Sequence, residues 1–197
     1  ALPALGGMLS FGIPEYRLPK KALQKEIGEI IARGVEVECG VRIGKDLPFE
    51  QLLEAGYDGI FLAVGAWKSS SLGVSGEDLP GVVHAIDLLR DANLAILKKS
   101  ALPKVGKKVA VVGGGNAAID AARTALRLGA KEVHLVYRRT REEMPAEAKE
   151  ISEAVHEGVK MHFLAAPKQA VGKKSVTGLE CYQMTLSEFD RSGRRRP

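Results

Sequence analysis

Residues 107–128 read KKVAVVGGGNAAIDAARTALRL, and this stretch decides the fold. The apolar run 107–112 predicts a buried strand, the three glycines after it a tight turn, and the small-residue run 116–128 a helix that ends at Gly129. Residues 132–137 (EVHLVY) then predict a second strand. Strand, glycine-rich turn, helix and strand in this order are typical of a parallel βαβ unit with a right-handed crossover. The sequence therefore predicts an α/β protein with a Rossmann-like domain that binds NAD(P).

The glycine turn matches the pattern G-x-G-x-x-A and lies between a strand and a helix, which is the context that the dinucleotide fingerprint requires. Gly113 permits the tight turn, Gly115 lets the backbone approach a pyrophosphate, and Ala118 lets helix and strand pack closely. The free N–H groups at the start of the helix would face the anion. The predicted contacts are Gly113, Gly114, Gly115, Asn116, Ala117 and Ala118. The alternative is a glycine-rich turn that only packs against its own sheet.

Two arginines, Arg138 and Arg139, follow the second predicted strand. An NAD site places an acid at this strand end, whereas an NADP site offers arginine to the 2′-phosphate. Each charge-assisted bond to a phosphate contributes about 1.5 to 3 kcal/mol, so we expect a preference for NADP(H) over NAD(H) of roughly tenfold or more. The alternative is a solvated basic turn in which Glu142 and Glu143 pair with Arg139 and Arg141.

The rest of the chain predicts a first domain over residues 1–100 and the nucleotide domain over 101–197, divided by the Pro- and Gly-containing stretch 100–106. The first domain is expected to hold an irregular segment (1–15), helices (19–33, 49–55 and 84–98), an alternating strand (35–43) and a buried strand (58–64). After the βαβ unit we expect a helix (146–157), a strand (159–165), an antiparallel meander from residue 167 and a turn at 190–193.

Composition excludes several classes of protein. The chain is 45% hydrophobic and 27% charged, which is too apolar for a disordered chain. The net charge of +5 comes partly from four arginines in 191–196, so no general nucleic-acid surface is predicted. The sequence has no apolar run of membrane-spanning length and no pattern of a signal peptide, so no membrane partner and a cytoplasmic location are expected.

No catalytic or metal-binding set of side chains is predicted from spacing alone. Cys39 and Cys181 are far apart and form no CxxC pair, so we expect two buried thiols and neither a disulfide nor a zinc site. The four histidines show no metal-ligand spacing, and a packing or capping role is expected for each. Asp120 would either orient the phosphate turn or favour the positive helix end.

Several longer motifs together resemble one family. They are GGMLSFGIPEYRLPK (6–20), YDGIFLAVGAW (57–67), LGVSGEDLPGV (72–82), VAVVGGGNAAIDAARTALRLGA (109–130), VYRRTREEMPAEA (136–148) and LECYQMTLSEFDRSGRRRP (179–197). In this order they resemble the FAD- and NADPH-binding small subunit of NADPH-dependent glutamate synthase, and related ferredoxin:NADP oxidoreductase subunits and dihydropyrimidine dehydrogenase flavin domains. The resemblance covers nearly the whole chain.

The resemblance implies a two-dinucleotide-binding-domain flavoprotein in which residues 1–100 are part of an FAD-binding domain. Ile13, Pro14, Arg17, Ala63 and Gly65 would then lie against FAD, and the glycine turn with Arg138 and Arg139 would bind NADPH. Hydride would pass between NADPH and FAD, and electrons would continue to an iron–sulfur subunit or domain. The family's first FAD fingerprint, its returning FAD segment and its cysteine clusters are not among these residues, so we expect a fragment with an incomplete FAD site.

A non-catalytic NADP-binding module, which binds nucleotide without turnover, is the alternative function. An incomplete FAD domain would expose apolar surface, so self-association is a further expectation.

Overall fold

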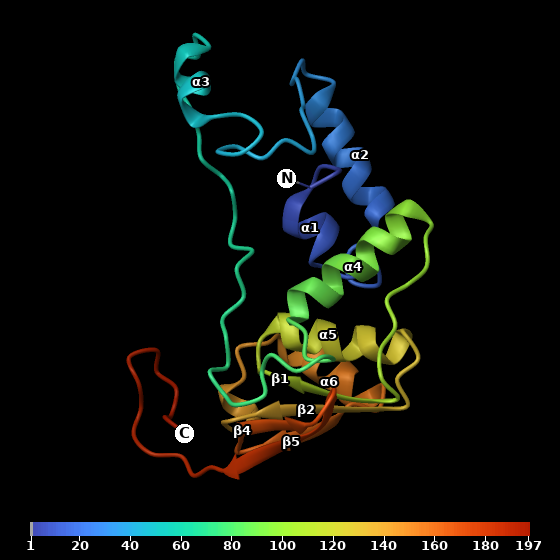
Figure 1. The fold of residues 1–197 in the computed structure, drawn as a ribbon, viewed down its shortest axis with the longest axis vertical. Helices are drawn as coiled ribbons and strands as arrows, with labels where there is room; N and C mark the ends of the chain where they lie inside the picture. Colours follow the sequence, from blue (N-terminus) through green and yellow to red (C-terminus); the bar gives the residue numbers. More distant parts are fainter. Residues whose placement is uncertain (1) are drawn as a thin grey trace. The chain divides into compact units, whose positions relative to one another are not determined.

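The structure is a computed structural model that describes residues 2–197 and divides into two compact units. The first unit ends at Lys68 and the second begins at Ser69. Figure 1 shows the course of the chain through its helices and strands. Each unit is described by itself below.

The second unit contains a three-stranded parallel sheet in the order β1-β2-β3. Its elements are β1 (Lys108–Val112), α5 (Asn116–Arg127), β2 (Glu132–Tyr137), the 3₁₀ turn η1 (Arg141–Glu143), α6 (Ala148–His156) and β3 (Lys160–Phe163). The predicted βαβ unit is therefore confirmed, with α5 crossing from β1 to β2 and α6 crossing from β2 to β3. The carboxyl ends of the three strands lie at one edge of the sheet, as parallel pairing requires.

The core of this unit lies between the sheet and its two crossover helices. Alternate residues of a strand face opposite sides, and Val133, Leu135 and Tyr137 of β2 belong to the buried cluster that α5 and α6 cover. On α5 all residues from 118 to 125 are buried, and the alanines among them recur with helical spacing, namely Ala118, Ala121, Ala122 and Ala125. Because alanine side chains are short, the backbone of α5 can lie close to the strands.

A further helix, α4 (Ala85–Lys98), packs against α5 within the same unit. It buries Leu89, Ala92 and Ala95 on one face, which confirms the helix expected at 84–98. The packing of the chain thus divides it after residue 68, before α4. The expected boundary at 100–106 instead separates the part expected to bind FAD from the part expected to bind NADP(H). That cofactor division stays a prediction.

Two antiparallel strands, β4 (Ala165–Gly172) and β5 (Val176–Gln183), confirm the expected meander. In Figure 1 they lie on the side of the parallel sheet away from α5, and β4 contacts β2. The segment before α4 joins this layer, because the N–H of Ala170 donates to the carbonyl of Ser75 at 2.8 Å. The expected turn at 190–193 is present, closed by the N–H of Gly193 on the carbonyl of Asp190 at 3.0 Å.

The first unit is helical with long irregular connections. It contains α1 (Gly7–Phe11), α2 (Lys20–Ile31) and α3 (Phe49–Glu54). The helices expected at 19–33 and 49–55 are confirmed. The expectation of a wholly irregular segment 1–15 is wrong, because α1 forms one turn there and the Ser10 hydroxyl donates to the carbonyl of Leu5 at 2.7 Å.

The strands expected at 35–43 and 58–64 are absent from the described residues, and both predictions are wrong. Their side chains are largely exposed, including Phe61 at 91% and Val64 at 81%. A strand needs a neighbour to accept its backbone hydrogen bonds. Among residues 2–197, the segment 35–65 forms one isolated bridge, between Ile43 and Leu47, and the N–H of Gly40 donates to the carbonyl of Leu2 at 3.0 Å, but no ladder of bonds forms. An apolar or alternating pattern indicates strand propensity, but it does not supply a partner strand.

The prediction of two buried thiols is also wrong, because Cys39 and Cys181 are both free and exposed. Cys39 lies in the unpaired segment 35–43, and Cys181 lies on the half-covered strand β5. Among residues 2–197, no helix combines the length and apolar character that crossing a membrane would need.

The glycine turn offers a test of the packing. A Cβ at Gly114 would overlap the ring of Tyr137, with Cζ only 2.7 Å away, and this ring is held by a hydrogen bond from its hydroxyl to the carbonyl of Glu143 at 2.7 Å. Overpacking of this kind costs about 1–3 kcal/mol. We expect Gly114→Ala to lower the free energy of unfolding by that amount in urea titrations followed by circular dichroism.

Gly115→Ala is the matched control for this experiment. A Cβ at Gly115 meets only the Cγ of Pro145, at 3.9 Å, which is an ordinary contact. We expect a change within about 0.5 kcal/mol, as for substitutions that create no clash. Equal destabilisation by the two variants would contradict the packing described here.

Candidate functional site

The glycine turn joins the end of β1 to the start of α5. Gly113 has a φ of 141°, a conformation that favours glycine, and its N–H donates to the carbonyl of Val136 at 3.0 Å. Gly115 is the N-cap of α5, no side chain caps this helix end, and its first turn carries no acid. The positive end of the helix is thus left open to a negatively charged group.

The glycines of this turn differ in the space around them. A Cβ on Gly113 would lie 3.0 Å from the Cβ of Ala118, so Gly113 serves both the turn and the close packing of α5. Gly115 instead faces nearly open space, as a backbone that approaches a phosphate requires. These positions agree with the roles predicted for the two glycines, and the binding itself stays a prediction.

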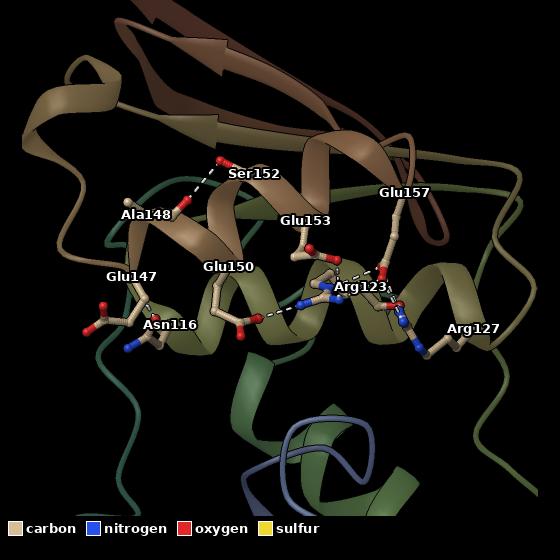
Figure 2. A network of polar contacts seen from close by, with 9 residues as sticks. All are labelled: Asn116, Arg123, Arg127, Glu147, Ala148, Glu150, Ser152, Glu153 and Glu157. Carbon is tan, nitrogen blue, oxygen red and sulfur yellow. Dashed lines mark hydrogen bonds and ion pairs between the residues drawn. The ribbon is translucent and has the colours of Figure 1, made fainter.

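Hydrogen bonds join the glycine turn to the segment that follows β2. The N–H of Ala146 donates to the carbonyl of Gly114 at 3.1 Å, and the N–H of Glu147 donates to Oδ1 of Asn116 at 3.0 Å. Figure 2 shows the second bond at the start of α5 and α6. Asn116 therefore has its amide orientation set by a backbone donor, which leaves its Nδ2 as a donor for a ligand. Ala117 is exposed, and Ala118 is buried against the sheet.

A cavity of about 320 Å³ opens at the carboxyl ends of β1 and β2. In open parallel sheets this edge is where ligands bind. The lining residues are Leu72, Val74, Val112, Gly113, Val136, Tyr137, Arg138, Ala166 and Pro167. All belong to the second unit, and most are apolar. Leu72, Val74, Ala166 and Pro167 could not be assigned to a site from the sequence, because only the fold brings them to the strand ends.

Arg138 lies directly beside this cavity. Its side chain is exposed, and among residues 2–197 it has neither a hydrogen-bond nor an ion-pair partner. The predicted alternative paired this basic turn with Glu142 and Glu143. In the structure both of those carboxylates instead accept from the hydroxyl of Thr140, and Glu143 completes a capping box there. The Arg138 guanidinium therefore remains available to an anion.

Arg139 is placed quite differently from its neighbour. Its residue is 4% exposed, its Nη2 donates to Oδ2 of Asp190 at 2.7 Å, and its Nε donates to the carbonyl of Arg195 at 2.5 Å. The two arginines predicted to act alike thus face different surroundings. No local pattern indicates the Arg139–Asp190 pair, because 51 positions separate the two residues.

Asp190 also organises the turn in which it lies. Its Oδ1 accepts from the N–H and the hydroxyl of Ser192, at 2.8 and 2.5 Å, and from the N–H of Arg194 at 3.2 Å. The Ser192 hydroxyl foremost, with these backbone donors and the charge of Arg139, lowers the pKa of Asp190 to about 2. Asp190 is therefore a carboxylate at neutral pH.

An ionic network joins the two crossover helices of the sheet (Figure 2). Arg123 of α5, with a side chain only 7% exposed, pairs with Glu150 and Glu157 of α6. Its Nε and Nη2 donate to the two oxygens of Glu157 at 3.0 and 2.6 Å, and Arg127 donates to the same carboxylate at 2.7 Å. Together the hydrogen bonds from Arg127 and Arg123 lower the pKa of Glu157 to about 2. The network fixes α6 beside α5, and with it the segment that contacts Asn116.

The positions predicted to lie against a flavin all belong to the first unit. Lys20 orders the segment before α2, because its Nζ donates to the carbonyls of Leu9 and Ile13 at 2.7 and 2.5 Å. In the same segment the carbonyl of Pro14 accepts from the N–H of Arg17 at 3.0 Å. Ala63 and Gly65 lie in an exposed stretch without helix or strand. The cavity at the strand ends includes none of these positions, and their predicted role remains a prediction.

Two histidines lie together on the sheet. Nδ1 of His134 on β2 is 2.9 Å from Nε2 of His162 on β3, a contact that the sequence did not indicate because it depends on how the strands pair. His84 is the N-cap of α4, and His156 lies in the last turn of α6.

Within the described part of the chain, no group of three or more His, Cys, Asp or Glu side chains is placed to hold a metal ion. Asp120 is buried one turn into α5.

A sequence profile of the pyridine nucleotide-disulphide oxidoreductases matches residues 8–190. The chain belongs to this family. The resemblance that its motifs indicated is thereby confirmed, and the α/β fold with parallel and antiparallel strands is the one expected of it.

Curated relatives are similar over essentially the whole chain. The β subunit of NADP(+)-dependent formate dehydrogenase from Moorella thermoacetica is 50% identical over 100% of this chain and 28% of its own length. The NADPH-Fe(3+) oxidoreductase β subunit of Geobacter sulfurreducens is 46% identical over 98% of this chain and 28% of its own length. The small chain of NADPH glutamate synthase from Halomonas elongata is 41% identical over 99% of this chain and 42% of its own length. The chain thus spans well under half of each of these family members.

Among solved structures, Mycobacterium tuberculosis FprA in complex with NADPH matches with a TM-score of 0.80 at 21% identity. The match covers 99% of this chain and 58% of FprA. At this identity the likeness concerns the fold, which both chains share throughout the matched residues.

The Arg123–Glu157 network predicts a specific pH dependence of stability. The pKa of Glu157 is lowered on folding, so its ion pairs stabilise the protein fully above the ordinary pKa of 4.5. This contribution is lost as the pH falls from about 4.5 towards about 2. We expect the midpoint of urea unfolding of the wild-type chain to fall over this interval more steeply than that of Glu157→Gln.

Glu188→Gln is the control for this measurement, because Glu188 is exposed and far from the network along the chain. Its pH profile should match the wild type. Parallel profiles for the wild type and Glu157→Gln would show that the network does not stabilise the fold.

Proposed function

We propose that the second unit binds NADP(H), with the pyrophosphate at the glycine turn and the 2′-phosphate at the end of β2. The observation that carries this proposal is the free Arg138 guanidinium beside the strand-end cavity, next to a helix start that no side chain caps. An anion at the turn would meet the N–H groups of Asn116 and Ala117 and the positive end of α5. Arg138 would add a charge-assisted bond that only the phosphorylated dinucleotide can accept.

The family and the names of the relatives support this choice of cofactor. The Moorella, Geobacter and Halomonas proteins are named for NADP(+) or NADPH, and the FprA structure is described as a complex with NADPH. The chain keeps the glycine turn and the arginine at the positions where such a ligand would be recognised. We accordingly propose Gly113, Gly114, Gly115, Asn116, Ala117, Ala118 and Arg138 as the residues that contact NADP(H). Arg139, which is buried and paired with Asp190, would support Arg138 from behind.

In a longer protein we propose that this site serves a flavin-dependent oxidoreductase of the glutamate synthase small-subunit type. The two cofactors, when bound, would supply the redox chemistry, which is hydride transfer between a nicotinamide and a flavin. The chain's own residues bind and orient the nucleotide, and no acid or base of the chain is assigned to the reaction. Residues 1–100 would supply part of the FAD domain through Ile13, Pro14, Arg17, Ala63 and Gly65.

The partner proposed for this protein is an iron–sulfur subunit or domain that receives the electrons. Three of the relatives are named as subunits or small chains, which supports a place in a larger complex.

Self-association and location are two further parts of the proposal. The side chains of Phe61 and Val64 are exposed, and they would provide apolar surface through which isolated chains associate. A cytoplasmic location belongs to the same proposal, because two free, exposed thiols suit a reducing compartment.

One observation favours the alternative of a module that binds nucleotide without turnover. The cavity at the strand ends takes all its lining from the second unit, so nucleotide binding does not require the first. An absorption spectrum tests whether the purified 197-residue chain binds flavin. Flavin bands that bleach on addition of NADPH would support the oxidoreductase, and a colourless protein that still binds NADPH would show that these 197 residues by themselves act as a nucleotide-binding module.

The nucleotide preference is tested at Arg138. We expect Arg138→Gln to weaken NADPH binding roughly tenfold or more, because one charge-assisted phosphate bond contributes about 1.5–3 kcal/mol. NADH lacks the 2′-phosphate, and its dissociation constant should change less than about twofold, which is within the usual range for a surface substitution. Isothermal titration calorimetry of the same protein with both nucleotides measures the two constants.

Lys104→Gln serves as the charge-matched control, since Lys104 lies on the linker before β1, outside the cavity. It should leave the ratio of the two constants unchanged. Equal loss of NADPH and NADH binding in Arg138→Gln would defeat the assignment of the 2′-phosphate.

A further inference from the structure

The arginine-rich turn, residues 190–196, is joined to Arg139 after β2 by two acceptors, the carboxylate of Asp190 and the backbone carbonyl of Arg195. Oδ2 of Asp190 accepts from Nη2 of Arg139 at 2.7 Å, and the carbonyl of Arg195 accepts from Nε of the same guanidinium at 2.5 Å. The Arg139 side chain is 5% exposed and that of Asp190 is 23% exposed. An ion pair shielded to this degree is costly to break, because the charge left behind would be largely buried.

The two oxygens of Asp190 have separate roles. Oδ1 accepts the three hydrogen bonds that shape its own turn, from Ser192 and Arg194, while Oδ2 is left for Arg139. The turn is therefore ordered by itself and presents one preformed acceptor to the guanidinium. Because the two oxygens have different partners, a substitution can remove the acceptor that faces Arg139 and keep the acceptor that orders the turn.

Arg139 is also held through its backbone, next to the residue that borders the cavity. Its carbonyl accepts from the N–H of Leu164 at 3.1 Å, and the carbonyl of Val136 accepts from the N–H of Gly113 at 3.0 Å. Arg138 lies between these two fixed points. The Asp190–Arg139 pair adds a side-chain anchor on the residue that follows Arg138, and it neutralises the Arg139 charge. Within residues 2–197, Arg138 has no ion-pair partner of its own.

We propose that Asp190 is a positioning residue that sets the preference for the 2′-phosphorylated dinucleotide, by anchoring Arg139 and thereby holding Arg138 at the mouth of the cavity. This inference rests on the proposed NADP(H) site and goes beyond it, because it assigns selectivity to a residue on a distant turn. Asp190 is not among the residues that line the cavity, so in this proposal it acts through Arg139. Arg139, in this arrangement, is the link between the turn and the recognising arginine.

Asp190→Asn tests the proposal, because the amide keeps one oxygen that can accept at the Oδ1 position. At the Oδ2 position it places an NH₂ group, which cannot accept from Arg139, and the negative charge of the side chain is lost. We expect the dissociation constant of the 197-residue chain for NADPH to rise about fivefold or more, less than the rise in Arg138→Gln. The constant for NADH should stay within about twofold of the wild type, the ordinary range for a surface substitution. Glu188→Gln, which removes the same charge two residues away, should leave both constants unchanged.

Two further variants keep the test decisive. Asp190→Glu retains the carboxylate and should retain most of the preference for NADPH. Arg139→Met should lose as much preference as Asp190→Asn, and the double variant should lose no more than either one, because residues that act as a pair are not additive. Thermal melts of every variant would show whether the fold is intact, so that a loss of binding can be told from a loss of folding.

The outcomes separate this inference from the proposed function. If Arg138→Gln loses the NADPH preference while Asp190→Asn keeps it or binds NADPH more tightly, the role of Asp190 is overturned and the site stands. If Asp190→Asn weakens both nucleotides equally, its role is structural and the proposal also fails. If Arg138→Gln shows no selective loss, the NADP(H) site itself fails.

Discussion

The close packing of α5 against the parallel sheet is the constraint on which the rest of the second unit depends. The helix can lie close to the strands because four alanines lie on its buried face beside Ile119 and because Gly113 turns the chain sharply after β1. This packing places the start of α5 at the carboxyl edge of the sheet. The same edge carries the cavity and Arg138, so one packing requirement determines where a charged ligand would meet the protein.

The ionic network between α5 and α6 supports that packing from the other side. Arg123 is nearly buried, yet its charge is balanced by Glu150 and Glu157, which is the condition for a buried cation to be tolerated. Replacing one partner would leave the other charge uncompensated, whereas a fully apolar replacement of the network could be neutral. The network therefore matters chiefly because it positions α6, and the residues at the start of α6 contact the glycine turn.

Local patterns predicted the βαβ unit well because its elements are neighbours in sequence. The glycine run, the alanine stripe of α5 and the apolar β2 each carry their own signal, and the fingerprint depends on all three together. The strands expected at 35–43 and 58–64 failed because a strand is defined by its partner, which no local pattern supplies. The Arg139–Asp190 pair and the His134–His162 contact could not be predicted from local patterns either, because each joins residues far apart in the chain. The family could be predicted because several motifs occur in the same order along the whole chain.

The hydrogen bonds that tie the glycine turn to the segment after β2 have a mechanical consequence. Gly114, Asn116 and Tyr137 each bond to residues 143–147, so the two walls that would flank a dinucleotide form one stiff frame. A ligand that enters such a frame finds its contacts already arranged and immobilises few additional groups, which preserves affinity.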